Sequence, residues 1–171
     1  MKIEFEWLYF VQSQDYCRVN TSEPCTVQQL INHVVELSKT EYDFTYGKFT
    51  LMNPPPYPGR KYDMETLCEY EKGRCGESDR WWLKRKDPEI MEKVANRKIG
   101  KLYATTGYSN TDFSIWVEPE EGEAPLLWCG DCKAFKYFDA DGKKVGCLRG
   151  GKVWYASPVC EEFDPKGDTK E

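Results

Sequence analysis

Histidine is nearly absent from this sequence of 171 residues, in which His33 is the single example. Any metal site in the chain must therefore consist largely of thiolates, which excludes the common histidine-rich zinc and non-haem iron sites. His33 itself falls beside the apolar stripe of a predicted helix. We expect it to lie at a boundary or on the surface, because no partner base or nucleophile is apparent.

Long apolar runs and an excess of positive charge are also missing. No stretch approaches the length of a membrane-spanning helix. The formal net charge of −5 argues against a general nucleic-acid binder, since Lys and Arg must neutralise the phosphates. Glu4 and Glu6 interrupt the first twelve residues in a way that a signal peptide does not tolerate. We therefore expect a cytoplasmic protein if Met1 is the natural start; the alternative is a secreted protein whose signal was removed.

The recognisable parts of an enzyme are absent too. The sequence has no nucleophile motif, no glycine-rich loop that would cradle phosphate, and no pair of carboxylates in a clear setting. The acidic stretch EPEEGEAP at 118–125 is interpreted as a solvated linker. These absences favour an accessory or small subunit over a catalytic one.

What is present begins with the periodicity of an α+β fold. Thr26 precedes apolar residues at helical spacing, and Asp87 precedes a proline at the first position of a helical pattern. Both are predicted to be N-caps. The predicted elements are a strand over 3–11, a helix over 26–39, a strand or hairpin bent at Gly47 over 42–52, a helix over 87–100, and strands over 101–106 and 112–117. We interpret 53–59 as a stiff proline-rich connector and 63–85 as a loop region.

The linker divides the chain into two predicted domains. Residues 1–122 form a mixed α+β domain of unknown role, and residues 123–171 form a small irregular module rich in cysteine. A module of about 45 residues buries too little apolar surface to fold alone, so it needs an additional stabilising crosslink. The second domain is therefore expected to be held by a metal centre.

Eight cysteines are present, and four of them lie in the second domain with the spacing C-x2-C-x14-C-x12-C. These four are Cys129, Cys132, Cys147 and Cys160. One interpretation is a thioredoxin-like dithiol, in which WCGDCK would begin a helix, but the 39 residues after Cys132 are too few for that fold. Another is a structural zinc site, although zinc ligands usually come as two close pairs. The third is a [4Fe–4S] cluster, which one pair and two separate cysteines suit.

The segment CGDCKAFKYFDADGKKVGCLRGGKVWYASPVCEEF at 129–163 resembles the cluster-binding part of high-potential iron–sulfur proteins. It is also similar to the module found in small subunits of glycyl-radical enzymes of the 4-hydroxyphenylacetate decarboxylase and arylsuccinate synthase groups. The matching features are the Cys-x-x-Cys pair, the single Cys147, the Gly151-Lys152 pair before Val153 and Trp154, Tyr155, and the final Cys160 with Phe163. The resemblance covers about the last 45 residues of the chain and implies a [4Fe–4S] cluster held by the four cysteines, with zinc as the alternative.

The remaining cysteines are Cys17, Cys25, Cys68 and Cys75, in two looser pairs placed in predicted loops. They are interpreted as a second four-thiolate metal site, as two small disulfide loops, or as ordinary unpaired thiols. No spacing among them decides between these three alternatives.

The sequence therefore predicts an iron–sulfur accessory or electron-transfer subunit that docks on a larger protein subunit, an anaerobic glycyl-radical-type enzyme by the resemblance. Backbone amides near Gly130, Gly150 and Gly151 are expected to donate hydrogen bonds to sulfur. The alternatives are an adaptor protein with a structural four-cysteine zinc site and a secreted recognition domain stapled by disulfides. No nucleic-acid or membrane partner is expected.

Overall fold

The computed structural model describes residues 1–11, 14–40, 47–53, 63–75, 78–107, 110–123, 125–135, 147 and 161–166. The chain divides into two compact units. The first unit comprises residues 1–52 and 64–120, and the second comprises residues 53–63 and 121–171. The chain passes between them three times, at 52–53, 63–64 and 120–121, and the last of these points lies in the predicted linker at 118–125.

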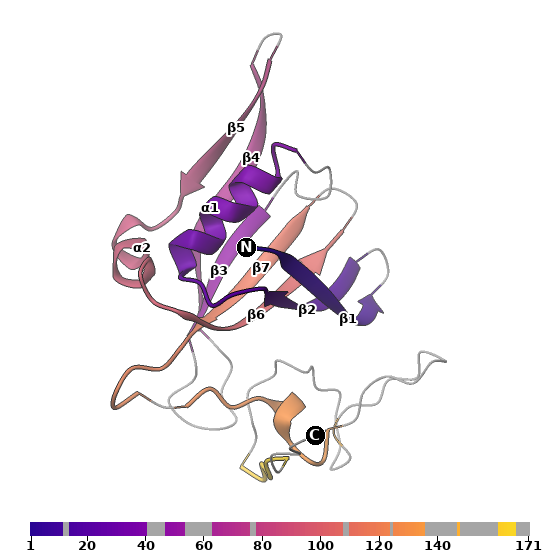
Figure 1. Ribbon diagram of the computed structural model, residues 1–171. Helices are drawn as coiled ribbons and strands as arrows, with labels where there is room; N and C mark the ends of the chain where they lie inside the picture. The colour runs from indigo at the N-terminus through magenta and orange to yellow at the C-terminus, as the bar shows by residue number, and fades with distance from the viewer. Residues whose placement is uncertain are drawn as a thin grey trace. The chain divides into compact units, whose positions relative to one another are not determined.

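The first unit is built on a seven-stranded mixed sheet with the strand order β1-β2-β6-β7-β3-β4-β5 (Figure 1). The strands are β1 (Ile3–Val11), β2 (Gln14–Thr21), β3 (Gly47–Asn53), β4 (Asp63–Cys75), β5 (Ser78–Arg85), β6 (Ile99–Thr106) and β7 (Thr111–Val117). Antiparallel ladders join β1 to β2, β2 to β6, β6 to β7 and β4 to β5, whereas β3 runs parallel to β7. Two α-helices accompany the sheet, so the predicted α+β class is confirmed.

Helix α1 (Val27–Leu37) runs across one face of this sheet and buries its apolar stripe there (Figure 1). Val27, Leu30, Ile31 and Val34 are almost fully buried, and their spacing puts them on one side of the helix. They share a core with inward-facing residues of the central strands, namely Phe49, Leu51, Leu102, Ala104, Phe113 and Ile115. His33 is half-buried, as the boundary position predicted for it requires.

The start of α1 is fixed by a capping box. The Thr26 hydroxyl accepts from the Gln29 amide at 3.3 Å, and the Gln29 side chain accepts from the Thr26 amide at 2.9 Å. Two amides that the helix leaves without an internal partner are thereby satisfied. The predicted cap at Thr26 is confirmed.

Removing this cap should lower the stability of the first unit measurably. We expect Thr26→Ala to reduce the free energy of unfolding by about 1 kcal/mol, because the Gln29 amide loses its acceptor. Urea denaturation followed by circular dichroism measures the change. Thr26→Ser keeps the hydroxyl and should stay close to the parent; an equal loss in both variants would show that the cap is not the cause.

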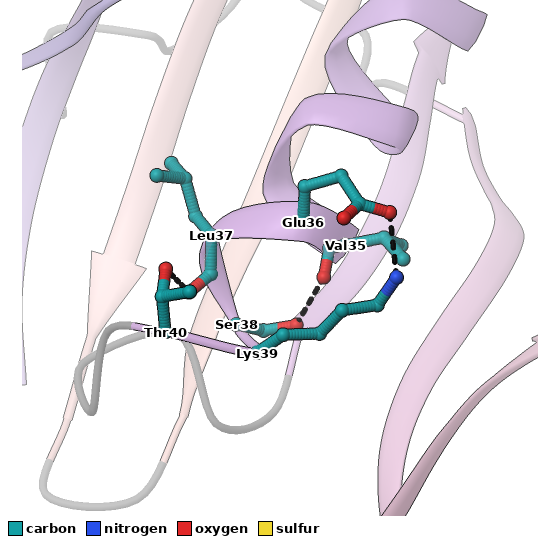
Figure 2. A network of polar contacts seen from close by, with 6 residues as sticks. All are labelled: Val35, Glu36, Leu37, Ser38, Lys39 and Thr40. Carbon is teal, nitrogen blue, oxygen red and sulfur yellow. Dashed lines mark hydrogen bonds and ion pairs between the residues drawn. The ribbon is translucent and has the colours of Figure 1, made fainter.

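The other end of α1 closes without a glycine (Figure 2). The Ser38 hydroxyl donates to the Val35 carbonyl at 2.7 Å, and the Thr40 hydroxyl donates to the Leu37 carbonyl at 3.2 Å. Lys39 pairs with Glu36 across the same turn at 2.6 Å. Side-chain hydroxyls therefore satisfy carbonyls of the last turn, the task that a C-terminal glycine motif performs in many helices.

Helix α2 (Pro88–Val94) begins as predicted and ends earlier than predicted. Asp87 caps it by accepting from the Glu89 and Ile90 amides, both at 3.1 Å. The helix ends at Val94, and Gly100 already belongs to β6, so the predicted end at Gly100 is wrong. The cause is tertiary pairing: the backbone of Arg97 accepts from Val27 at 3.1 Å, and Lys98 bridges to Thr26.

The interpretation of 63–85 as a loop region is also wrong. Strands β4 and β5 form an antiparallel hairpin in this part of the chain, paired from Cys68 with Arg85 to Cys75 with Ser78 (Figure 1). Among residues 64–69, only Leu67 and Cys68 are buried. The part of β4 whose side chains are described therefore lacks the regular alternation from which strands are predicted.

The opposite face of the sheet carries a row of aromatic side chains. Tyr103 lies between the core residues Leu102 and Ala104 in β6, so its side chain leaves the sheet on the other side. It stacks on Tyr16 at 5.5 Å between ring centroids and meets Trp116 edge-on at 5.6 Å. Strands β6 and β7 are therefore buried on both faces at this point. The strands predicted over 101–106 and 112–117 are confirmed.

In the part of the chain that the structure describes, no helix is long and apolar enough to cross a membrane.

Candidate metal centre

The Cys-x-x-Cys loop in the second unit is one turn of 3₁₀-helix, Cys129–Asp131, with Cys132 at its end. The Asp131 amide donates to the Trp128 carbonyl and the Cys132 amide donates to the Cys129 carbonyl, both at 3.0 Å. Trp128 is fully buried, and both cysteines are at most 9% exposed. Positions i and i+3 of such a turn lie on the same side, so the turn presents the two cysteines together.

A helix does not begin at this motif, which counts against the thioredoxin-like interpretation. Cys132 has an extended backbone, with φ −85° and ψ 139°, and it forms an antiparallel bridge with Pro165. In a thioredoxin-like site the second cysteine would lie in the helix whose N-terminus activates the first. The described residues instead show a short 3₁₀ turn, the extended Cys132, and a second turn that the Phe135 amide closes on the Cys132 carbonyl at 3.0 Å.

Residues 164–166, called here the C-terminal clamp, lie beside Cys132 and its two neighbours. The Lys133 amide donates to the Asp164 carbonyl at 2.8 Å, and the Lys166 amide donates to the Asp131 carbonyl at 2.7 Å. The ends of the clamp thus bind the residues on both sides of Cys132. More than thirty residues of sequence separate the two partners, so the loop is fixed by long-range pairing.

The clamp also directs a donor at sulfur. The Asp164 amide donates to the Cys132 Sγ atom at 3.5 Å, which is within the range for a sulfur acceptor. Hydrogen bonds from backbone amides to cysteine sulfur are among the interactions that tune thiolate-held metal centres. Such donors were predicted near Gly130, Gly150 and Gly151. The donor that the structure shows is Asp164, and Gly150 and Gly151 lie outside the described residues.

Two lysines add charge beside the loop. Lys166 Nζ donates to the Gly130 carbonyl at 2.8 Å and lies 5.8 Å from the centroid of the Phe135 ring. Lys133 Nζ pairs with Asp164 Oδ1 at 3.1 Å.

The third predicted ligand is placed in the same unit. Cys147 forms an antiparallel bridge with Phe135, three residues after Cys132. The structure thus brings the backbone of Cys147 alongside the segment that leaves the Cys-x-x-Cys loop. Cys160 lies outside the described residues, and its assignment as the fourth ligand stays a prediction.

Within the described ranges, Cys132 and Cys147 are free thiols. Also within those ranges, no group of three or more His, Cys, Asp or Glu residues is arranged to hold a metal ion. The donor chemistry of the loop fits a thiolate-bound metal centre: two cysteines presented by one turn, one of them with an amide donor on its sulfur.

Two of the other four cysteines, Cys17 and Cys68, lie far apart in the sheet. Cys17 lies in β2 and Cys68 in β4, not in the predicted loops, while Cys75 ends β4 and Cys25 precedes α1. Strands β2 and β4 are four positions apart in the sheet order, which is about 19 Å. Cys17, Cys25 and Cys68 are free, so neither predicted pair is a disulfide.

Burial determines the chemistry of these thiols. It raises the pKa of Cys17 to about 12, with Asp15 adding to the effect and a hydrogen bond to Thr106 opposing it. Burial likewise raises the pKa of Cys68 to about 12 against the opposing charge of Arg85. Both thiols stay protonated at neutral pH, which is typical of cysteines that pack in a core.

Fold and site together define an α+β protein with a mixed sheet in one unit and a braced Cys-x-x-Cys loop in the other. Comparison with protein-family models, with curated proteins and with solved structures found no match for this chain.

Proposed function

We propose that this chain is an iron–sulfur accessory or electron-transfer subunit whose second unit holds a [4Fe–4S] cluster. The ligands are Cys129, Cys132, Cys147 and Cys160. The observation that carries the proposal is the Asp164 amide on the Cys132 sulfur, within a loop that the C-terminal clamp fixes from both sides. When bound, such a cluster supplies one-electron transfer at a potential set by charge, hydrogen bonds to sulfur and solvent exposure.

The residues of the loop have separate tasks in this proposal. Cys129 and Cys132 bind the cluster, and the Asp164 amide stabilises the charge on one of their sulfurs. Trp128, which is fully buried, excludes water on the side from which the chain enters the loop. Phe135 aligns Cys147 with the loop through backbone pairing. Binding, charge stabilisation and exclusion of water are the levers that a protein has over such a centre.

The partner in this proposal is a larger enzyme subunit, of the glycyl-radical type that the resemblance of the C-terminal segment implies. The first unit would provide the docking surface. The size of the first unit supports this role, and so do two exposed apolar side chains, Trp7 at 56% and Met64 at 69% exposed. Apolar side chains at the surface are common anchors in protein–protein interfaces.

Metal analysis of the wild-type chain, expressed and purified without oxygen, tests the proposal. We expect brown protein with about four iron and four sulfide per chain. A colourless protein with one zinc ion and no sulfide would overturn it in favour of the structural zinc site. Four disulfides found by non-reducing mass spectrometry would overturn it in favour of the secreted recognition domain.

A further inference from the structure

Lys133 and Lys166 lie beside the same Cys-x-x-Cys loop but contact it in different ways. Lys133 pairs with the carboxylate of Asp164, and both side chains are largely in solvent, 60% and 45% exposed. Lys166 is likewise exposed, but its ammonium donates to the Gly130 carbonyl of the loop at 2.8 Å. One lysine therefore contributes a screened surface pair, and the other a contact with the backbone between two proposed ligands.

The Gly130 carbonyl needs a donor because the residue is buried. A buried carbonyl without a hydrogen bond costs free energy comparable to a lost bond, and a charged donor forms the stronger kind of bond. Lys166 also donates its own amide to the adjacent Asp131 carbonyl at 2.7 Å. A single residue thus binds two consecutive carbonyls, those of the two residues between Cys129 and Cys132.

The ammonium of Lys166 makes a second contact beside the loop. It lies 5.8 Å from the centroid of the Phe135 ring, within the range of a cation–π contact. Phe135 is 7% exposed and pairs with Cys147 through the backbone. Lys166 therefore touches both the Cys-x-x-Cys loop and the residue that places the third cysteine.

We infer that Lys166 is the positioning residue of the metal centre: it fixes the orientation of the Cys129–Cys132 loop and adds a positive charge to it. The inference rests on the proposed function in so far as these two cysteines are ligands. Residues that hold ligands in place through hydrogen bonds typically change metal affinity about 10- to 100-fold when they are removed. Lys133 carries the same charge and should contribute much less.

The experiment compares Lys166→Met with Lys133→Met in the full-length chain, both prepared without oxygen. Methionine keeps most of the stem and removes the ammonium, so each variant loses one positive charge. Release of iron to an excess of chelator is followed by absorbance. We expect Lys166→Met to release iron about tenfold faster than the parent, and Lys133→Met to stay within about twofold. Lys166→Arg retains the charge and a donor and should restore slow release.

A second readout separates charge from packing. The midpoint potential of the cluster should fall further in Lys166→Met than in Lys133→Met, because a cation near the sulfurs favours the added electron. The difference should shrink in 1 M salt, where an exposed charge is screened within about 3 Å. A purely structural contact would change the release rate and leave the potential where it was.

The outcomes for the inference and for the proposed function are distinct. Equal release rates and equal potentials in the two methionine variants would overturn the role of Lys166, while an intact cluster in the parent would leave the proposed function standing. Zinc in place of iron and sulfide in the parent would overturn the proposed function. Release of zinc from the same variants would then test Lys166, and equal rates would again contradict it.

Discussion

Replacement of Cys132 by alanine is expected to remove iron and sulfide from the protein. Cys132 is a free thiol that is 5% exposed, and the C-terminal clamp places an amide donor at its sulfur. Its loss removes a proposed ligand and leaves that amide without its acceptor. Because the loss of an outer partner alone typically weakens a metal centre about 10- to 100-fold, we expect at least about a 100-fold loss here.

The measurement is iron and sulfide per chain in protein purified without oxygen, together with the visible absorption of the sample. Cys17→Ala is the matched control, since it deletes the same atoms from a buried thiol in β2. We expect that control to keep its iron and sulfide. Full iron content in Cys132→Ala would contradict the ligand assignment, and loss of iron from Cys17→Ala would point to the other four cysteines.

Much of the first unit could be predicted from local signals in the sequence. The apolar spacing of α1 and the Thr26 cap identify a helix, because both depend on neighbours within one or two turns. The strands on either side of the turn at 107–110 were identified by their apolar residues. The order of the strands in the sheet could not be predicted from such local signals, because the parallel pairing of β3 with β7 joins segments about sixty residues apart.

The β4–β5 hairpin was missed for a related reason. Its residues pair mainly across the strands, and few of the described ones are buried, so the sequence carries no clear period. The Cys129–Cys132 loop and its contacts with the C-terminal clamp were predicted only in part. The spacing of Cys129 and Cys132 was sufficient to identify a ligand pair, whereas Asp164 and Lys166 act through contacts across more than thirty residues. The only available signal was the short polar DPK sequence after the last cysteine.

The core of the first unit should be most sensitive at Phe49. This residue is fully buried in β3, and its ring stacks on that of Phe113 in β7 with 5.4 Å between the centroids and 8° between the planes. The pair lies where the parallel ladder joins the two strands, beneath α1. We expect Phe49→Ala to lower the free energy of unfolding by about 3–5 kcal/mol, from lost transfer free energy and the cavity left behind.

A loss of that size is a large fraction of the stability of a typical domain, about 5–15 kcal/mol, so the variant should unfold at much lower urea concentration. Far-ultraviolet circular dichroism follows the transition. Met64→Ala is the control, because Met64 is a large apolar residue of β4 that is 69% exposed, and its loss should change the stability by less than about 0.5 kcal/mol. Similar losses in the two variants would mean that α1 and the β3–β7 pair do not enclose the core. If these elements do enclose the core, Phe49→Leu, which refills part of the cavity, should recover more than half of the free energy of unfolding that Phe49→Ala loses.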